Sequence, residues 1–258
     1  MQSYLNQFGQ SGRNSETAQY YLAESYYVTE DKANALIAYQ ELLKMTGSQY
    51  TEEAALRCAE ISYDRKDYTS ALTYFKRLET VVQSPENKNI SHLGILRCSF
   101  FLNDHQTTVK MATEIISDPH SGEELKSEAL YNRAKAYLAL NQFAEAMVDL
   151  KILSSDTRTM NGAESNYLLA NLYFDQGKMT DVEKIVMDFA RKNTPHQFWL
   201  ARSFVLLADM YIKLNNDFQA KQYLLSLQKN YKPADEIQTL ITQRLNDISG
   251  REKKSIIN

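Results

Sequence analysis

Residues 19–27 read QYYLAESYY, and this stretch decides the fold because its pattern returns along the chain. Within it, Leu22 precedes the small residue Ala23, and Tyr26 follows three positions later. The same small residue with similar neighbours returns in RCAEIS (57–62), NRAKAY (132–137), LLANLY (168–173) and LLADMY (206–211). Self-similarity at a fixed interval is the mark of a repeat protein, so the period of the pattern has to be established first.

The period is near 37 residues. Central alanines stand at positions 23, 59, 134, 170 and 208, so three separations are 36, 36 and 38 residues and the fourth is 75. The long separation predicts a sixth, degenerate unit between Leu93 and Ile116, centred near Arg97 and Cys98. In this unit threonines and Val109 stand where an alanine and an aromatic residue are expected, which leaves its register open by about two residues.

A second small residue follows each central alanine after twelve positions, and an apolar residue follows four positions later. The pairs are Ala35 with Tyr39, Ala71 with Phe75, Ala146 with Leu150, Val182 with Val186, and Ala220 with Leu224. Short polar turns, such as residues 29–32 and 64–67, separate the two segments of a unit. Two helices joined by a short turn form an antiparallel hairpin, and small residues at the crossing let the backbones approach closely.

This pattern resembles the tetratricopeptide repeat, which has a leucine, a small residue and a tyrosine on its first helix and A-x3-F on its second. The resemblance implies an all-α fold, a right-handed superhelical solenoid of antiparallel helix hairpins. The expected segments are 1–13 as the end of a preceding repeat helix, repeats at 14–49, 50–86, 87–122, 123–159, 160–194 and 195–232, a capping helix at 233–250 and a tail at 251–258.

Two helix starts are predicted where a capping residue and a proline stand together. Thr194 before Pro195 predicts an N-cap with proline in the first turn, and residues 232–235 predict the start of the final helix in the same way. That last segment is amphipathic, which is typical of a cap that ends a stack of repeats. Its apolar face is expected to carry Ile237, Leu240, Ile241, Leu245 and Ile248.

A second stripe on each first helix is the candidate binding surface. Tyr20, Glu24 and Tyr27 are spaced i, i+4 and i+7, away from the packing positions of Leu22 and Ala23. In the resembled family the matching stripe lines a concave groove, which the resemblance therefore implies here. The candidate groove residues are Tyr20, Glu24, Tyr27, Glu60, Tyr63, Tyr131, Lys135, Tyr167, Asn171, Phe174 and Asp209; the degenerate unit would add Phe101.

The chemistry of this stripe predicts a ligand with peptide character. Tyrosine and phenylalanine supply stiff contact area, and tyrosine keeps a hydroxyl for peptide groups. Glu24, Glu60 and Asp209 would add a partly acidic character that favours Lys or Arg in the ligand. Stacked repeats also use aromatic rings to fill gaps between units, so packing is the alternative role for each ring.

These features predict a non-catalytic scaffold that binds a protein or peptide, as an extended segment or a partner helix. Two alternatives remain open at this point: the same rings could hold glycan or peptidoglycan strands by stacking, or the chain could be purely architectural. No cofactor is expected, and the oligomeric state stays open. The net charge of −3, with both signs interspersed, argues against nucleic acid, and the longest apolar runs are too short for direct membrane insertion.

Candidate catalytic and metal-binding motifs are sparse. The histidines lack metal-ligand spacing, and only His120, in a loop with Asp118 and Glu123, has nearby carboxylates; a solvated turn is the simpler interpretation. We therefore expect no catalytic residue and no metal ligand. Cys58 and Cys98 both follow Leu-Arg in apolar segments, which favours small buried core residues over a disulfide or a reactive thiol.

The N-terminal region carries a more specific resemblance. Tyr4 and Leu5, a polar gap, and the alanine- and tyrosine-rich residues 16–27 resemble tetratricopeptide proteins of the Gram-negative envelope. Residues 193–211 resemble the C-terminal part of long repeat proteins from Bacteroidetes. The resemblance implies a periplasmic or outer-membrane-associated role in assembling an envelope complex, with a cytoplasmic location as the alternative, and we expect the chain to be cut from a longer protein.

Overall fold

The computed structural model describes residues 2–8 and 12–257, which form helices and no strand. The helices are α1 (Gln2–Phe8), α2 (Ser15–Val28), α3 (Lys32–Leu43), α4 (Thr51–Asp64), α5 (Tyr68–Val81), α6 (Pro85–Phe101), α7 (His105–Ser117), α8 (Glu123–Ala139), α9 (Phe143–Leu153), α10 (Met160–Asp175), α11 (Met179–Arg191), α12 (Gln197–Lys213), α13 (Asp217–Asn230) and α14 (Glu236–Ile257). The chain divides into two compact units, with the boundary between Leu140 and Asn141. We call them unit 1 and unit 2 and describe each by itself.

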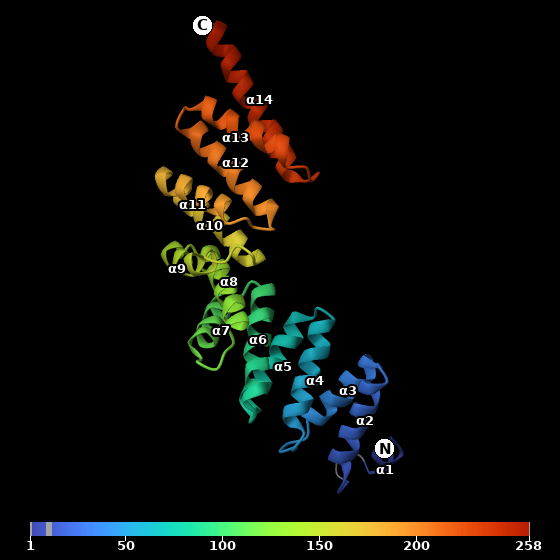
Figure 1. The fold of residues 1–258 in the computed structure, drawn as a ribbon. Coiled ribbons are helices and arrows are strands. Elements are labelled where there is room, and N and C mark those ends of the chain that lie inside the picture. Colours follow the sequence, from blue (N-terminus) through green and yellow to red (C-terminus); the bar gives the residue numbers. More distant parts are fainter. Residues whose placement is uncertain (1, 9–11, 258) are drawn as a thin grey trace. The chain divides into compact units, whose positions relative to one another are not determined.

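In unit 1, each of the helices α2 to α7 packs against the next one along the chain. Consecutive helices run in opposite directions, so α2 and α3, α4 and α5, and α6 and α7 form three antiparallel hairpins (Figure 1). Small side chains line their crossings, and Ala23, Ala35, Ala59 and Ala71 are fully buried. Tyr39 is also fully buried and keeps its hydroxyl satisfied by donating to the Glu24 carboxylate.

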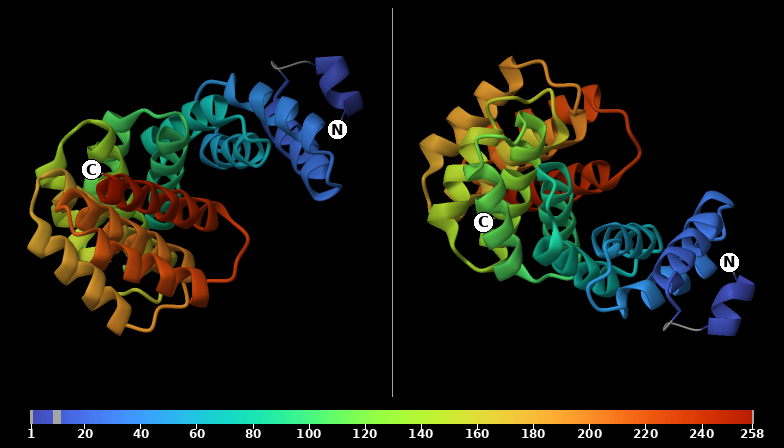
Figure 2. Two further views of the ribbon diagram at one scale, coloured as in Figure 1. Left: turned by 90° about the horizontal axis from the view of Figure 1, so that it is seen from above. Right: turned by 90° about the horizontal axis from the view of Figure 1, so that it is seen from below.

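In unit 2, α9 to α13 also pack each against the next helix, and α14 packs on both α12 and α13 (Figure 2). The hairpins α10/α11 and α12/α13 bury the expected small residues, among them Ala170, Ala208 and Ala220. Ile237 and Ile241 of α14 are fully buried in the same core as α12 and α13. Each unit is therefore an all-α stack of antiparallel hairpins, which confirms the predicted fold class.

The turns inside the five hairpins and the turn between α8 and α9 have the same backbone geometry. One residue in each adopts a left-handed conformation, with φ between 56° and 73°, and these residues recur at intervals of 36 to 38 positions. They are Glu30, Lys66, Asn103, Asn141, Gly177 and Asn215. After each of these residues except Asn141, the amide of the next residue donates to a carbonyl five positions earlier, as from Asp31 to Tyr26 at 2.9 Å, which satisfies the end of the first helix.

The residue after the left-handed position is the N-cap of the second helix. Asp31, Asp67 and Asp104 each accept a hydrogen bond from the backbone N–H three positions later, at 3.1 to 3.2 Å. Aspartate at an N-cap satisfies one of the helix's unpaired amides. Short turns of this kind leave little freedom in the angle between the paired helices.

The turn geometry settles the register of the degenerate unit. Asn103 is its left-handed residue, so Leu96 takes the place of the central alanine and Thr108 that of the second small residue. Ala112 then stands where the other hairpins carry Tyr39, Phe75 or a branched apolar residue. Leu96, Thr108 and Ala112 are all fully buried, so the unit exchanges its large and small core positions rather than losing its core.

The same register corrects one predicted groove residue. It places Leu93, Arg97 and Phe100 on the stripe that corresponds to Tyr20, Glu24 and Tyr27. Phe101 lies one position further round α6 and is half exposed. The division of the chain into six repeats at the stated boundaries remains a prediction.

Three predicted helix ends differ from the structure, and one is the start of the final helix: α14 begins at Glu236, so Pro233 lies outside its first turn. Helix α12 begins at Gln197, after Pro195, because Thr194 turns the chain by accepting from the His196 amide at 3.1 Å and donating to the Thr157 carbonyl at 2.6 Å. Helix α14 continues through Gly250 to Ile257, where a tail was predicted. Within the described ranges, no helix has both the length and the apolar character that crossing a membrane requires.

Ion pairs to α13 explain the longer final helix. Arg251 makes two hydrogen bonds of 2.8 Å with the Asp217 carboxylate, and Glu252 accepts from Lys221. These side chains hold the last turns of α14 against the preceding hairpin. The polar gap noted after Leu5 includes residues 9–11, which lie outside the described residues.

Candidate functional site

The predicted groove residues all lie on first helices and are all half-buried. Seven belong to unit 1, on α2, α4 and α8, and four belong to unit 2, on α10 and α12. We call this set the first-helix face of each unit. A half-buried side chain has packing partners and also solvent contact, so the contacts of each residue decide how much of it remains for a ligand.

On α2 and α4 the first-helix face is organised around Tyr27. The Arg57 guanidinium lies 4.5 Å from the centre of this ring, and the Lys32 ammonium lies 3.4 Å from it. Arg57 also forms ion pairs with Glu53 at 2.8 Å and with Glu60 at 3.0 Å. Cation–π contacts and paired charges of this kind fix the ring between two successive hairpins.

Two other residues of α2 are bound to neighbouring aromatics. Tyr20 stacks on Tyr50, with ring centres 4.1 Å apart and planes 5° from parallel. Burial of the Tyr20 ring raises the pKa of its hydroxyl, and the nearby Glu24 carboxylate raises it further. Glu24 itself accepts the hydroxyl of Tyr39, so its carboxylate is already engaged within unit 1.

On α4 and α6 the face carries an aromatic cluster that reaches solvent. Tyr63 meets Tyr68 and Phe75 edge-on, with ring centres 5.5 and 6.5 Å apart. Tyr68 in turn stacks on Phe101 at 4.5 Å, and half of the Phe101 surface remains exposed. Burial raises the pKa of the Tyr63 hydroxyl.

Between α6 and α8 an ion pair occupies the corresponding stripe position. Arg97 donates to both carboxylate oxygens of Glu128, at 2.6 and 2.8 Å. These hydrogen bonds raise the pKa of the Arg97 guanidinium. On α8 the Lys135 ammonium lies 5.8 Å from the centre of the Tyr131 ring.

In unit 2 the face continues over α10. The Tyr167 ring lies 5.6 Å from Trp199 and 5.1 Å from the Arg202 guanidinium, both on α12. The Phe174 ring contacts Lys213, whose ammonium is 4.8 Å from the ring centre. Rings of α10 thus bridge to basic and aromatic groups of the next first helix.

The polar residues of the face in unit 2 have partners within the unit. Asn171 donates to Asp175 at 3.1 Å. Asp209 accepts two hydrogen bonds from Arg244 of α14, at 3.0 and 3.1 Å. The carboxylates of the face thus have hydrogen-bond partners within their units, but Glu60 and Asp209 pair with arginines whereas Glu24 pairs with a neutral hydroxyl.

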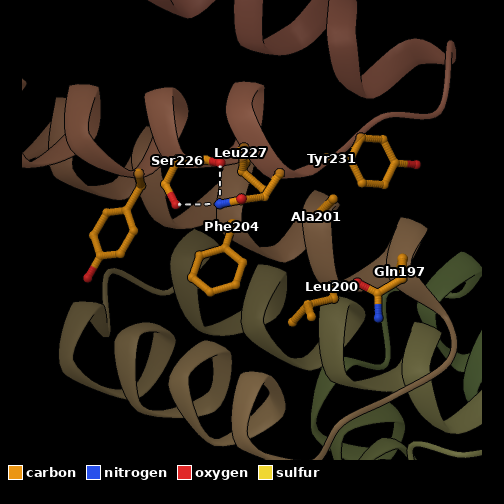
Figure 3. Close-up of a pocket in the computed structure, with 9 residues that line it drawn as sticks. Gln197, Leu200, Ala201, Phe204, Ser226, Leu227 and Tyr231 are labelled. Carbon is orange, nitrogen blue, oxygen red and sulfur yellow. Dashed lines mark hydrogen bonds between the residues drawn. The ribbon is translucent and has the colours of Figure 1, made fainter.

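The sequence did not reveal a small cavity between α12 and α13. It has a volume of about 190 Å³ and is lined by Leu200 and Phe204 of α12 and by Leu227 and Ser226 of α13 (Figure 3). Asn230 also lines it and donates to the Ser226 carbonyl at 2.9 Å. Ligand pockets usually enclose roughly 300–1,000 Å³, so this cavity suits one apolar side chain better than a cofactor.

The cysteines and His120 lie where the sequence placed them. Cys58 and Cys98 are free thiols with no exposed surface. His120 is exposed in the turn after α7, where its amide donates to Asp118 at 2.8 Å. The sequence therefore predicted the surroundings of these side chains well.

Comparison with known proteins agrees with this geometry. The tetratricopeptide repeat profile matches residues 17–45, 128–156 and 198–233. A search among curated proteins gave no match.

Two solved structures share the fold. The type IV pilus biogenesis factor PilW is 20% identical, with 89% of this chain and 100% of that chain covered and a TM-score of 0.52. The Pseudomonas aeruginosa protein pilF is 15% identical, with 88% and 97% covered and a TM-score of 0.52. At these identities the likeness concerns the fold alone. Together with the recurring hairpins and turns, these matches show that the chain contains tetratricopeptide repeats.

Proposed function

We propose that this chain is a non-catalytic scaffold whose first-helix faces bind an extended peptide or a partner helix. Tetratricopeptide domains bind protein partners. The proposal names the surface of this chain that binds the partner and the form in which the partner is bound. The observation that carries it is the half-burial of every predicted face residue. Their rings are held at a fixed place by neighbours and still offer contact area, which is the preorganised form that binding favours.

The contacts on the face also specify the ligand. Glu24, Glu60 and Asp209 already accept hydrogen bonds from Tyr39, Arg57 and Arg244, so less of their acceptor capacity remains for a basic peptide. These ion pairs are also partly exposed, and a further charged contact there would add little binding energy. We therefore propose a ligand that contributes apolar or aromatic side chains and main-chain hydrogen bonds, with few net charges.

The test is a selection of randomised displayed peptides on the full chain, followed by titration of the selected peptides. Tyr27→Leu and Tyr63→Leu keep much of the packing volume but remove the ring and the hydroxyl. Each should weaken binding by about 1–2 kcal/mol, roughly 5- to 30-fold in Kd. Phe218→Ala is the matched control, because this ring is 72% exposed on the second helix α13. Selected peptides that bind both leucine variants as tightly as the wild type would contradict the proposal.

Glycan binding by ring stacking predicts a different result. Trp199 lies beside Tyr167, so its fluorescence reports on ligands at the face of unit 2. Under the peptide proposal, peptidoglycan fragments leave this emission unchanged. A saturable change with fragments, abolished by Tyr167→Leu, would favour the glycan alternative.

We also propose that the scaffold serves the assembly of a cell-envelope complex. The support is the resemblance of the N-terminal segment to envelope repeat proteins, and one protein of like fold, PilW, is described as a type IV pilus biogenesis factor. Fractionation of the source cells, with an antibody against this chain, should recover it with the envelope. Recovery in the cytosol alone would contradict this part of the proposal.

A further inference from the structure

Three potential metal ligands from three helices of unit 1 come together near the degenerate hairpin. Glu79 lies on α5, His92 on α6 and Glu114 on α7, and α6 packs against both of the other helices. One ligand atom from each residue lies within 4.8 Å of the other two. No sequence motif connects these residues, because each comes from a different helix.

The cluster is poorly satisfied by its own contacts. The His92 side chain is only 12% exposed, yet its Nε2 lies 3.5 Å from the Glu79 carboxylate, beyond the usual length of an N–H···O hydrogen bond. Glu114 meets Lys110 at 3.9 Å, and that lysine side chain is 72% exposed. Two carboxylates are thus held near each other and near a largely buried imidazole, with only one loose cationic contact.

A bound cation would relieve this arrangement. We propose that Glu79, His92 and Glu114 bind a divalent transition-metal ion of the Zn²⁺ type, which ties α5, α6 and α7 together. Imidazole nitrogen with carboxylate oxygen is a donor set that Zn²⁺ accepts, whereas Ca²⁺ needs six to eight oxygens and Mg²⁺ retains most of its water. Three protein ligands leave the fourth tetrahedral position to water.

The geometry asks for small side-chain movements only. Ligand atoms at about 2.1 Å from a tetrahedral zinc ion lie about 3.4 Å from one another. The two glutamates can close the remaining distance by rotating about their side-chain bonds, since both are half-buried rather than packed in the core. The Lys110 contact is weak enough to be released, as exposed ion pairs contribute little.

The test measures Zn²⁺ binding to the full chain by calorimetry, with Co²⁺ as a spectroscopic probe of tetrahedral coordination. The wild type should bind one Zn²⁺ ion and show a higher Tm when it is bound. His92→Gln, Glu79→Gln and Glu114→Gln should each weaken binding at least about tenfold, because even supporting residues of metal sites have effects of that size. The matched control is His120→Gln, which removes the histidine that the sequence placed near carboxylates, and should bind as the wild type does.

A purely structural contact among these residues would behave differently. In metal-free buffer, Glu79→Gln removes repulsion between carboxylates and should leave the Tm unchanged or raise it. Circular dichroism of the metal-free variants shows that they are folded before zinc is added. The proposal is overturned if the wild type binds no Zn²⁺, if His92→Gln binds it with unchanged affinity, or if only His120→Gln loses binding.

Discussion

Gly94 shows how one missing side chain shapes the contact between two hairpins. A Cβ at this position would lie 2.4 Å from the Phe75 ring, far inside van der Waals contact. The ring of α5 can therefore lie directly on the backbone of α6, and both residues are buried. Glycine usually weakens a helix by about 0.5–1 kcal/mol relative to alanine, so here the packing outweighs the propensity.

We predict that Gly94→Ala destabilises the protein by about 1–3 kcal/mol, because Phe75 must move in a filled core. The matched control is Gly250→Ala on α14, where an added Cβ meets nothing within 4 Å. This control should be neutral or stabilising by up to about 1 kcal/mol. Urea unfolding of both variants provides the comparison, and an equal effect of the two substitutions would refute the steric explanation.

The two thiols make a second prediction at the residue scale. Burial raises the pKa of Cys58 and of Cys98 from 9.0 to about 12. The thiolate is the reactive form, so native protein should react slowly with a disulfide reagent at about pH 8, and both thiols should react at once in urea. Rapid reaction of the native protein would contradict the buried placement.

The same pKa values set a direction for stability against pH. The folded state holds these protons more tightly than the unfolded state, so their contribution is complete below pH 9.0 and is lost as pH rises toward about 12. The unfolding free energy should therefore be lower at about pH 10.5 than at about pH 8. In the double variant Cys58→Ala, Cys98→Ala this difference should be smaller.

At the scale of the element, the degenerate hairpin keeps its core by exchanging large and small positions. Leu96 stands where other hairpins have alanine, and Ala112 stands where they have Tyr39, Phe75 or Leu150. We predict that Leu96→Ala costs about 2–5 kcal/mol by opening a cavity. Ala112→Leu alone should cost about 1–3 kcal/mol by overpacking, yet it should recover stability in the Leu96→Ala background.

A double-mutant cycle measures this compensation. Stability from urea unfolding of the two single variants and the double variant should give a coupling energy of about 1 kcal/mol or more in favour of the double variant. Additive effects, within about 0.5 kcal/mol, would show that the two positions do not share packing space.

The contrast between hairpins explains how much the sequence could predict. Alanine spacing and tyrosine position indicated five of the units because local pattern and packing agree there. The register of the sixth was left open because Leu96, Thr108 and Ala112 reverse the expected sizes. The signal for its register lies in the turn, where Asn103-Asp104 matches Lys66-Asp67 and Asn215-Asn216.

For the candidate site, the sequence predicted which side chains share the first-helix face but not their partners. Periodicity places Tyr27 and Asp209 on a stripe. It cannot show that the Arg57 guanidinium lies over the Tyr27 ring, or that Arg244 of α14 pairs with the Asp209 carboxylate. Those contacts join residues about thirty positions apart or more, and depend on the rotation of each hairpin against the next. The cluster of Glu79, His92 and Glu114 was missed for the same reason.

At the scale of the whole molecule, the division into two units implies that each unit has its own free energy of unfolding. Repeat stacks are held by contacts between neighbouring helices, so a defect weakens its own surroundings most. Leu96 is fully buried in unit 1, and Leu207 of α12 is fully buried in unit 2. Substitution of one leucine in each unit therefore tests whether a cavity in one unit destabilises the other.

We predict that Leu96→Ala accelerates amide hydrogen exchange in peptides up to Leu140 and leaves those after Asn141 near their wild-type rates. Leu207→Ala should have the opposite effect, because opening a cavity lowers the free energy of local unfolding where the cavity lies. Exchange followed by mass spectrometry under native conditions resolves both regions in one experiment. If either substitution accelerated exchange equally along the whole chain, the protein would unfold as one cooperative body, and the division at Leu140 would have no energetic meaning.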